Sequence, residues 1–486
     1  MSRKKKELPE IRNVEITGVA AEGNAIARLK LKESDPDPIV IFVPFGAPGD
    51  IVNIKIDRRK HSFCEGHITQ ILFPSPVRLE PPCEYFGICG GCRWQHLPYP
   101  EQLKYKRQQV VDALTRIGKI DLPHIKETLG SKKIWHYRNK MEYTFSNRRW
   151  KSWAEMRGEV PQDDATDALG FHIPGSFDKV LQIDQCLLQE GIGDRMRNYL
   201  YNLAREKRYS FYDIKENKGL LRTLMIRIAE SGQIMVCLSF GENDNELIFE
   251  ILESIKNEFP EITSLQYVVN LKLNDSIADQ EVINYKGPGY IEETMGNLKF
   301  RISAKSFYQT NSLQAHALYK TTATFAGLVK NEDSKEKPIV YDLYTGTGTI
   351  ANFVAGSAKK VIGIEYVEDA VEDAKINSKI NGIDNTEFYA GDMKDLLTEQ
   401  FLEHHGKPQV MIIDPPRAGM HADVVDVILK SDTPVIVYVS CNPATQARDL
   451  SLLDRKYKVT DVQPVDMFPH THHVENVVRL ELRSNN

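Results

Sequence analysis

The sequence predicts an α/β protein built from a small β-barrel, a mixed α+β region and a parallel, doubly wound sheet. Short alternating apolar runs split by Gly and Pro fill residues 10–73, which is typical of small barrels. Apolar runs separated by helical stretches follow residue 338, which is the rhythm of a parallel sheet covered by helices. Between these regions strands and helices mix without a phosphate-binding loop.

The predicted barrel unit spans residues 1–73. Stretches such as "VEITGVAAEGNAIARL" and "PIVIFVPFGAPGDIVNIKI" alternate apolar and polar positions, so we expect each strand to bury one face and expose the other. The stretch "SPVRLEPP" then ends the alternation. Its prolines cannot continue a strand ladder, so it marks the expected boundary.

The predicted central unit spans residues 74–300. Residues 101–118 have helical spacing, with apolar side chains on one side at Leu103, Val110, Val111, Leu114 and Ile117. The stretch "YRNKMEYTFSNRRW" alternates basic and aromatic side chains, as a sheet facing nucleic acid would. A half-buried strand with a charged outer face explains it equally well.

A cysteine cluster lies at the start of the central unit. The stretch "PPCEYFGICGGCRWQH" spaces Cys83, Cys89 and Cys92 as C-x5-C-x2-C, and Cys186 in "QIDQCLL" supplies a fourth thiol. Four thiolates suit an iron–sulfur cluster or tetrahedral zinc. The spacing differs from the C-x3-C-x2-C of radical enzymes, and a fourth cysteine closes the site. We therefore expect a closed [4Fe–4S] cluster, with zinc as the alternative.

The predicted C-terminal unit, residues 301–486, carries a cofactor loop. In "YDLYTGTGTIANF" a strand leads through Tyr344 to Gly346 and Gly348, and a helix follows. Glycines at such a turn let the backbone approach a ligand closely. Glu365 ends the next strand, where an acid can bind both ribose hydroxyls. Asp392 follows the strand after that and could meet an adenine amine.

The cofactor loop favours a cationic nucleoside over a pyrophosphate. Position 351 is Ala where a dinucleotide fingerprint has its third glycine, and no lysine follows the loop, which excludes a P-loop. Acidic groups at Asp342 and Glu365 suit a sulfonium cofactor better than a phosphate. We therefore expect S-adenosylmethionine, with NAD as the alternative.

Two further strand ends carry reactive side chains. "IIDPPRAG" places Asp414 at the end of one apolar strand, and "YVSCNP" places Cys441 at the end of the next. With Asn442 as helix N-cap, the helix N-terminus is expected to lower the pKa of the Cys441 thiol. A core thiol is the usual role of a lone strand cysteine, but this position favours a nucleophile. Glu475 in "HHVENVVRLELR" begins a last buried strand.

Composition limits the classes of function. The whole chain has a net charge of −5, but residues 1–150 hold 26 Lys and Arg against 17 Asp and Glu. This basic third indicates a polyanionic partner, although a solvated face without a partner explains the charge equally well. The chain lacks a long apolar run and a secretory signal, so we expect a cytoplasmic protein with no membrane contact.

These motifs together resemble the S-adenosylmethionine-dependent RNA uracil-5-methyltransferases. The stretches "SFYQTN", "DLYTGTG", "DPPRAG", "SCNP" and "HHVENV" stand in the order of that family. Residues 10–73 resemble its TRAM module, an oligonucleotide-binding barrel similar to the OB-fold, and the cysteine pattern resembles its [4Fe–4S] site. The resemblance implies a Rossmann-like class I methyltransferase domain and a helix 101–118 packed upon it.

The resemblance also implies roles for single residues. Cys441 is the implied nucleophile and Glu475 the implied base. The implied cofactor contacts are Gln309 of "SFYQTN", Tyr344, Glu365, Asp392 and Asp414, and the implied cluster ligands are Cys83, Cys89, Cys92 and Cys186. Thr349 and Asp392 both stand where many members have Asn, which weakens those two contacts.

The expected activity is methylation of C5 of a specific uridine in RNA through a covalent adduct between Cys441 and C6. The TRAM module and the cluster together favour 23S ribosomal RNA, and a tRNA T-loop uridine is the alternative. An adenine amino-methyltransferase would need an aromatic residue where Arg417 stands. A catalytically inactive RNA-binding or assembly protein is the alternative that is not an enzyme. We expect a monomer.

Overall fold

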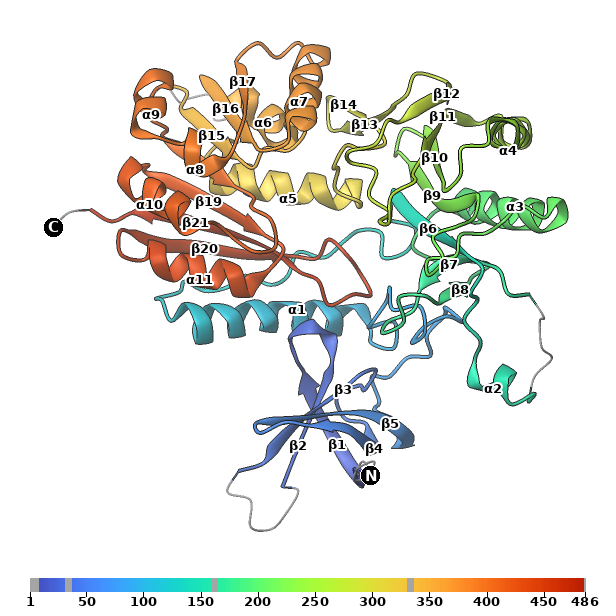
Figure 1. Ribbon diagram of the computed structural model, residues 1–486. Helices are drawn as coiled ribbons and strands as arrows, with labels where there is room; N and C mark the ends of the chain where they lie inside the picture. Colours follow the sequence, from blue (N-terminus) through green and yellow to red (C-terminus); the bar gives the residue numbers. More distant parts are fainter. Residues whose placement is uncertain (1–7, 31–36, 160–164, 330–335, 485–486) are drawn as a thin grey trace, which may run out of the picture.

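The computed structural model describes residues 8–30, 37–159, 165–329 and 336–484. Figure 1 shows a barrel at the bottom, a sheet of orange and red strands at the upper left and a green sheet at the right. In the part of the chain described, no helix combines the length and the apolar character needed to cross a membrane.

Five strands close into the predicted N-terminal barrel. Their neighbours run in the order β1-β2-β3-β5-β4, and their bounds are β1 (Glu10–Val19), β2 (Ala25–Leu29), β3 (Ile39–Val43), β4 (Ile51–Arg59) and β5 (Phe63–Phe73). A 3-10 turn, η1 (Ala21–Gly23), joins β1 to β2. Alternate residues such as Ile16, Ile41 and Val52 are fully buried inside it, so the predicted barrel is confirmed.

The central sheet has seven strands in the order β12-β11-β10-β9-β6-β7-β8. These are β6 (Lys140–Ser146), β7 (Ala168–His172), β8 (Val180–Gln182), β9 (Leu221–Ile228), β10 (Ile234–Phe240), β11 (Ile262–Val269) and β12 (Ile283–Lys286). Helices α3 (Gly191–Lys207) and α4 (Asn245–Glu258) share its apolar core, and a short helix, α2 (Trp153–Met156), lies outside it. Tyr143 and Phe145 of β6 are fully buried, so these aromatic side chains form core and do not face a nucleic acid.

The C-terminal sheet is the predicted doubly wound sheet. Its order is β17-β16-β15-β18-β19-β21-β20, with β15 (Ile339–Leu343), β16 (Lys360–Glu365), β17 (Thr386–Ala390), β18 (Val410–Ile413), β19 (Val435–Ser440), β20 (Tyr457–Val465) and β21 (Glu475–Leu482). Neighbouring strands from β17 to β19 are parallel, and β21 runs antiparallel between β19 and β20.

Helices cover both faces of this sheet. One apolar cluster packs α5 (Ser312–Phe325), α6 (Thr349–Val354) and α7 (Glu368–Ile380) against it, and a second packs α10 (Ala422–Ser431) and α11 (Pro443–Leu453). The shorter helices are η3 (Ala355–Ser357), α8 (Met393–Leu396) and α9 (Glu399–His405). Apolar strands with helices on both faces confirm the predicted fold class.

Helix α1 (Tyr99–Ala113) continues as a π-helical turn, Leu114–Gly118, and packs on α11 and β20. In Figure 1 it runs between the barrel and the C-terminal sheet. Lys106 of α1 forms a fully buried ion pair with Asp466, which follows β20. A hairpin of β13 (Ile291–Met295) and β14 (Leu298–Ile302) precedes α5. The expected domain limits at residues 73 and 300 stay predictions.

Candidate active site

The predicted reactive residues gather at the carboxyl edge of the C-terminal sheet. Tyr344 follows β15, Glu365 ends β16, Asp414 follows β18 and Cys441 follows β19. Because β21 is antiparallel and pairs Asn476 with Ser440 of β19, continuing the register sets Glu475 opposite Cys441. Ligands of open α/β sheets bind outside this edge.

The glycine loop is tied directly to Glu365. The Glu365 carboxylate accepts hydrogen bonds from the backbone N–H of Gly346 at 3.0 Å and of Val367 at 3.0 Å. Gly348 has φ +73°, and a Cβ there would lie 2.8 Å from Ala374 Cβ, so only glycine fits. Tyr344 also has a positive φ, of +64°, and backbone strain of this kind is concentrated at ligand sites.

The loop that carries Gln309 lies beside the glycine loop. The Thr347 hydroxyl donates to the carbonyl of Phe307 at 3.4 Å. From the central sheet's side, the Asn139 side chain donates to the carbonyl of Gln309 at 3.0 Å. The Asn139 backbone N–H also donates to the carbonyl of Thr310 at 2.8 Å. Gln309 is thus held next to the same strand edge as Glu365.

Asp392 is engaged in a local role. Its carboxylate caps α8 by accepting from the backbone N–H of Lys394 at 3.2 Å, and it pairs with the Lys394 ammonium at 3.4 Å. The backbone N–H of the preceding Gly391 donates to the Glu365 carbonyl at 2.8 Å. Asp392 therefore lies at the expected strand end, with its side chain turned to its own helix.

Three acidic side chains, Asp342, Asp414 and Glu475, lie near one another at this strand edge. Burial raises the pKa of Asp342 to about 7, against the hydrogen bond from Thr345. Burial and the charge of Asp342 raise the pKa of Asp414 to about 7. Burial and Asp414 raise the pKa of Glu475 to about 8. Neighbouring acids that cannot all ionise are a mark of catalytic sites.

The Cys441 thiol is surrounded by opposing charges. Burial, followed by the charges of Glu475 and Asp414, raises its pKa to about 11, while the charge and hydrogen bond of Arg417 act in the other direction. The pKa is therefore raised, and not lowered as expected from the α11 N-terminus, because burial and two carboxylates disfavour the thiolate. Asn442 does cap α11 as predicted, accepting from the Ala444 N–H at 3.1 Å.

Arg417 is a site residue that the sequence analysis did not assign. Its carbonyl accepts from the Asn442 side chain at 3.1 Å and from the Thr445 hydroxyl at 3.1 Å, which ties the arginine to the first turn of α11. Its guanidinium lies 3.3 Å from Nδ1 of His473. Its place after "DPP" was visible in the sequence, but its contact with Cys441 arises only from folding.

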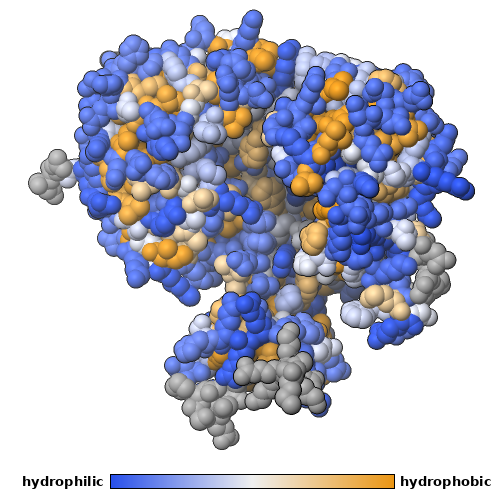
Figure 2. Space-filling model, in the orientation of Figure 1, coloured by the Kyte–Doolittle hydropathy of each residue, from blue (hydrophilic) through white to orange (hydrophobic). Residues whose placement is uncertain are grey.

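Cys441 opens into a cavity of about 610 Å³. The cavity is shared by four parts of the chain: the β1–β2 turn of the barrel, the segment before α1, α1 itself and the loops around Cys441. Its lining consists of Ala21, Glu22, Asn24, Arg93, Gln109, Ala113, Arg417, Cys441, Asn442, Pro443, Ala444, His472, His473 and Val474. Figure 2 shows a hollow between the two upper lobes of the molecule, above the barrel.

The four predicted cluster cysteines line a single separate cavity of about 500 Å³. All four are free thiols. Burial raises the pKa of Cys92 to about 12 and that of Cys186 to about 11. Among the described residues, no group of three or more His, Cys, Asp or Glu side chains is close enough to hold a single metal ion.

The donor set of the cysteine cavity fits either an iron–sulfur cluster or a zinc ion. Thiolates are ligands of both groups, and all four cysteines line this one cavity.

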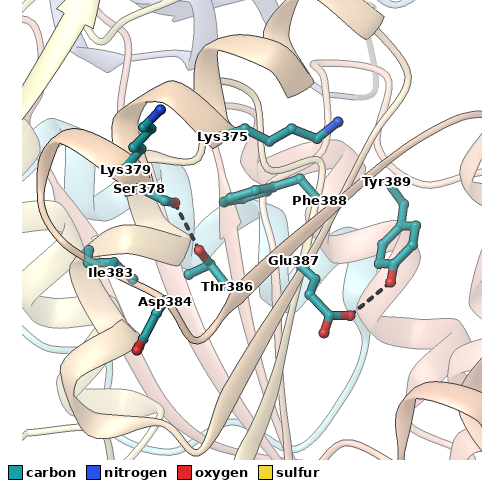
Figure 3. A pocket seen from close by; sticks show the side chains of 9 residues that line it. All are labelled: Lys375, Ser378, Lys379, Ile383, Asp384, Thr386, Glu387, Phe388 and Tyr389. Carbon is teal, nitrogen blue, oxygen red and sulfur yellow. Dashed lines mark hydrogen bonds between the residues drawn. The ribbon is translucent and has the colours of Figure 1, made fainter.

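A further hollow, of about 480 Å³, lies between α7 and β17 at the edge of the C-terminal sheet. Figure 3 shows its side chains, among them Lys375, Lys379, Glu387 and Tyr389, with a hydrogen bond between the last two. None of the predicted site residues lines it. It is a groove on the outside of the sheet and adds nothing to the catalytic edge.

Comparisons with known proteins agree with this geometry. Residues 287–483 match the family model described as tRNA (Uracil-5-)-methyltransferase, and residues 5–69 match the TRAM domain model. A Bacteroides thetaiotaomicron protein named an uncharacterized RNA methyltransferase is 55% identical over 468 residues, 96% of this chain and 100% of that protein. One from Porphyromonas gingivalis with the same name is 53% identical over 474 residues, 96% of this chain and 99% of that protein.

Among solved structures, one resembles the chain over nearly its whole length. It is the Pyrococcus abyssi tRNA (uracil-54, C5)-methyltransferase in complex with S-adenosyl-L-homocysteine, with a TM-score of 0.71 and 28% identity. The match covers 97% of this chain and 100% of that one, so it includes the barrel, the central sheet and the C-terminal sheet.

Proposed function

The chain belongs to the S-adenosylmethionine-dependent RNA uracil-5-methyltransferase family, and from that premise we propose that it methylates C5 of one uridine of 23S ribosomal RNA through a covalent Cys441 adduct. The observation that carries the proposal is the position of Cys441 and Glu475, which adjoin the paired residues Ser440 and Asn476 of β19 and β21, with Cys441 lining the cavity. A nucleophile and a base on opposite strands can act on neighbouring carbons of one pyrimidine ring.

The cofactor is held by the strand edge beside this pair. S-adenosylmethionine supplies an electrophilic methyl group on a sulfonium. Glu365, fixed by Gly346, suits the ribose hydroxyls. Asp414 and Gln309 lie where they can position the sulfonium end, and Tyr344 lines the turn. The Asp392 carboxylate caps its own helix, so it is less available to the cofactor than the other proposed contacts.

Cys441 opens the reaction. C5 of uracil is a poor nucleophile, so the Cys441 sulfur adds to C6 and the electrons of the C5–C6 double bond move onto C4–O4 as an enolate. The thiol gives its proton to solvent water, and the resulting thiolate sulfur attacks C6. Arg417 assists, since its charge and hydrogen bond favour the thiolate against burial and the two carboxylates. C5 then becomes nucleophilic enough to take the methyl group.

Glu475 completes the reaction. After methyl transfer, C5 carries both a hydrogen and a methyl group, and the Glu475 carboxylate removes that proton. The electrons restore the C5–C6 double bond and expel the Cys441 thiolate. The target ring must leave its stack to reach the cavity, and the basic first third of the chain suits the RNA backbone.

We also propose that Cys83, Cys89, Cys92 and Cys186 hold a [4Fe–4S] cluster with a structural role. Support comes from their shared cavity and from the four free thiols that line it. Cys186 lies far along the chain from the other three, so the cluster would tie the segment before α1 to the central sheet. Zinc is the alternative, and measurement of the metal content distinguishes the two.

The choice of 23S RNA rests on the combination of a TRAM barrel with this cysteine site. The tRNA T-loop uridine is the second candidate, and one specific observation favours it. The Pyrococcus abyssi structure is of a tRNA enzyme and covers 97% of this chain, so the barrel alone does not separate the two RNA classes. We place the reaction in the cytoplasm, with the chain acting as a monomer.

The testing experiment is methylation of fractionated RNA with methyl-labelled cofactor, followed by mapping of the modified base. The proposal expects label in 23S RNA as 5-methyluridine at one site, and no transfer by Cys441→Ala. Label confined to tRNA would replace the RNA assignment and leave the chemistry intact. Methyl transfer by Cys441→Ala would overturn the covalent mechanism.

A further inference from the structure

The tip of the barrel forms one wall of the cavity that holds Cys441. This barrel tip, residues 21–24, is the turn between β1 and β2, and Ala21, Glu22 and Asn24 line the cavity. A pyrimidine ring fills only part of a space of about 610 Å³, which is in the range of pockets for much larger ligands. The cavity therefore has room for a second nucleotide group beside the target base.

The barrel tip is firmly seated. Trp94, itself fully buried, donates from its indole N–H to the Gly23 carbonyl at 3.0 Å. The turn is closed by the Ala20 N–H, which donates to the Asn24 carbonyl at 2.7 Å. Gly23 has φ +82°, and a Cβ there would lie 2.9 Å from the His472 Cβ. The tip is thus packed directly on the loop that precedes Glu475.

Glu22 lines this wall in a backbone conformation that glutamate rarely adopts. Its φ of +68° lies in the left-handed region, which disfavours side chains other than Gly, Asn and Asp. It is exposed, and within the described ranges its carboxylate makes no hydrogen bond or ion pair. Residues with a strained backbone are concentrated at ligand contacts, and the Glu22 carboxylate is open to one.

The charge of Glu22 restricts what it can bind. RNA phosphates repel a carboxylate, so its favourable RNA partners are the N–H donors on base edges and the ribose 2′-hydroxyl, and only the base edges carry sequence information. Asn24 offers both a donor and an acceptor beside it. Arg93, across the same cavity, supplies the cation that a phosphate needs. The wall therefore combines base-reading groups with a backbone contact.

We propose that the barrel tip forms a second nucleotide subsite, which reads a base next to the target uridine through its exocyclic amino group. The proposal rests on the proposed function and adds the determinant of sequence preference to it. Glu22 accepts the amino hydrogen of adenine, cytosine or guanine, and Asn24 pairs with the neighbouring ring atom. Uracil has no amino group, and its single N3–H donor is flanked by two carbonyl oxygens that repel the carboxylate, so a uridine at this position is disfavoured.

The test uses hairpin RNAs that contain the mapped methylation site, with each of the four bases at every position within two nucleotides of the target. The wild-type chain is expected to prefer an amino-bearing base over uridine at one position by about tenfold or more in kcat/KM. Glu22→Ala should reduce that preference to less than about threefold. Glu22→Gln keeps an acceptor oxygen and should retain part of it.

Glu15→Ala is the matched control, because Glu15 is an exposed acid of the same barrel that does not line the cavity. It should keep the full preference. A wild-type enzyme with equal kcat/KM for all flanking bases, or an unchanged preference in Glu22→Ala, would overturn the subsite. Absence of methyl transfer to C5 by the wild-type chain would instead overturn the proposed function.

Discussion

At the scale of single residues, opposing charges act on the pKa of the Cys441 thiol. Burial, Glu475 and Asp414 hold its proton in place, and Arg417 opposes them. The strand end and the Asn-Pro cap were readable from the sequence. The direction of the pKa shift was not, because it depends on burial and on carboxylates brought in from β18 and β21.

The rate of proton removal should depend on the ionisation of Glu475. Burial first, and Asp414 second, raise its pKa to about 8, with Arg417 acting against them. A base must be ionised, so the rate of proton removal is expected to rise by roughly tenfold per pH unit below this pKa, and any further rise above it comes from the Cys441 thiol, whose pKa is about 11. Two other titratable groups face the Glu475 carboxyl group: Asp414, with a pKa of about 7, and Cys441, with a pKa of about 11.

The check is a profile of the single-turnover rate between about pH 6 and pH 9.5, a range that brackets the Glu475 pKa of about 8. RNA binding is measured at each pH. Glu475→Asp, which retains a carboxylate, should keep a rising limb at reduced rate. A flat profile for the wild-type chain would contradict the assignment of Glu475 as base.

Arg417 should set the reactivity of the Cys441 thiol. Because its charge and hydrogen bond lower the thiol pKa, Arg417→Gln is expected to raise that pKa and to slow alkylation of Cys441 by iodoacetamide about threefold or more at pH 9. Mass spectrometry of the peptide with Cys441 measures this rate separately from the other thiols.

Arg12→Gln serves as the control, because Arg12 is an exposed arginine on the barrel strand β1 and does not line the Cys441 cavity. An alkylation rate in Arg417→Gln equal to that of the control would show that the guanidinium does not act on the thiol.

At the scale of elements, α1 fixes the loop that leads to Glu475. Lys106 pairs with Asp466 and donates to the Phe468 carbonyl at 3.0 Å, and Tyr99 donates to Asp466 at 2.9 Å. Gln102 accepts from the His470 N–H at 2.8 Å. The helical spacing of residues 101–118 predicted α1. Its polar partners could not be predicted, because they lie 360 residues or more away along the chain.

Breaking the buried pair should destabilise the fold. Lys106→Met leaves the Asp466 carboxylate buried without its cation, so the free energy of unfolding should fall by about 3–5 kcal/mol. Lys106→Met combined with Asp466→Asn removes both charges and should recover much of that loss. Urea unfolding midpoints of the two variants measure the difference. Equal stability of Lys106→Met and the wild type would contradict this role.

At the scale of the whole molecule, long-range contacts assemble both functional cavities. The predicted barrel and doubly wound sheet followed from alternation and apolar runs that each segment carries by itself. The seating of the barrel tip on His472 left no signal in the sequence, because Gly23 reads as an ordinary turn residue. The cysteine spacing predicted one site, and the four thiols do line one cavity.

Metal content tests the proposed cluster. Anaerobically purified protein should contain roughly four irons per chain, and Cys92→Ser or Cys186→Ser should lose most of them. Cys64→Ala is the control, because Cys64 is buried inside the barrel away from the four-cysteine cavity. One zinc per chain would replace the cluster by a zinc site. Iron retained in Cys92→Ser would show that the four cysteines are not its ligands.

The most direct test of the central claim is trapping of the covalent intermediate. Glu475→Gln can form the adduct and transfer the methyl group, but it cannot remove the C5 proton, so a denaturant-resistant RNA–protein species should accumulate in the presence of cofactor. Digestion and mass spectrometry should find a methylated uridine attached to Cys441. Absence of this species while methylation proceeds, or attachment at another residue, would contradict the account.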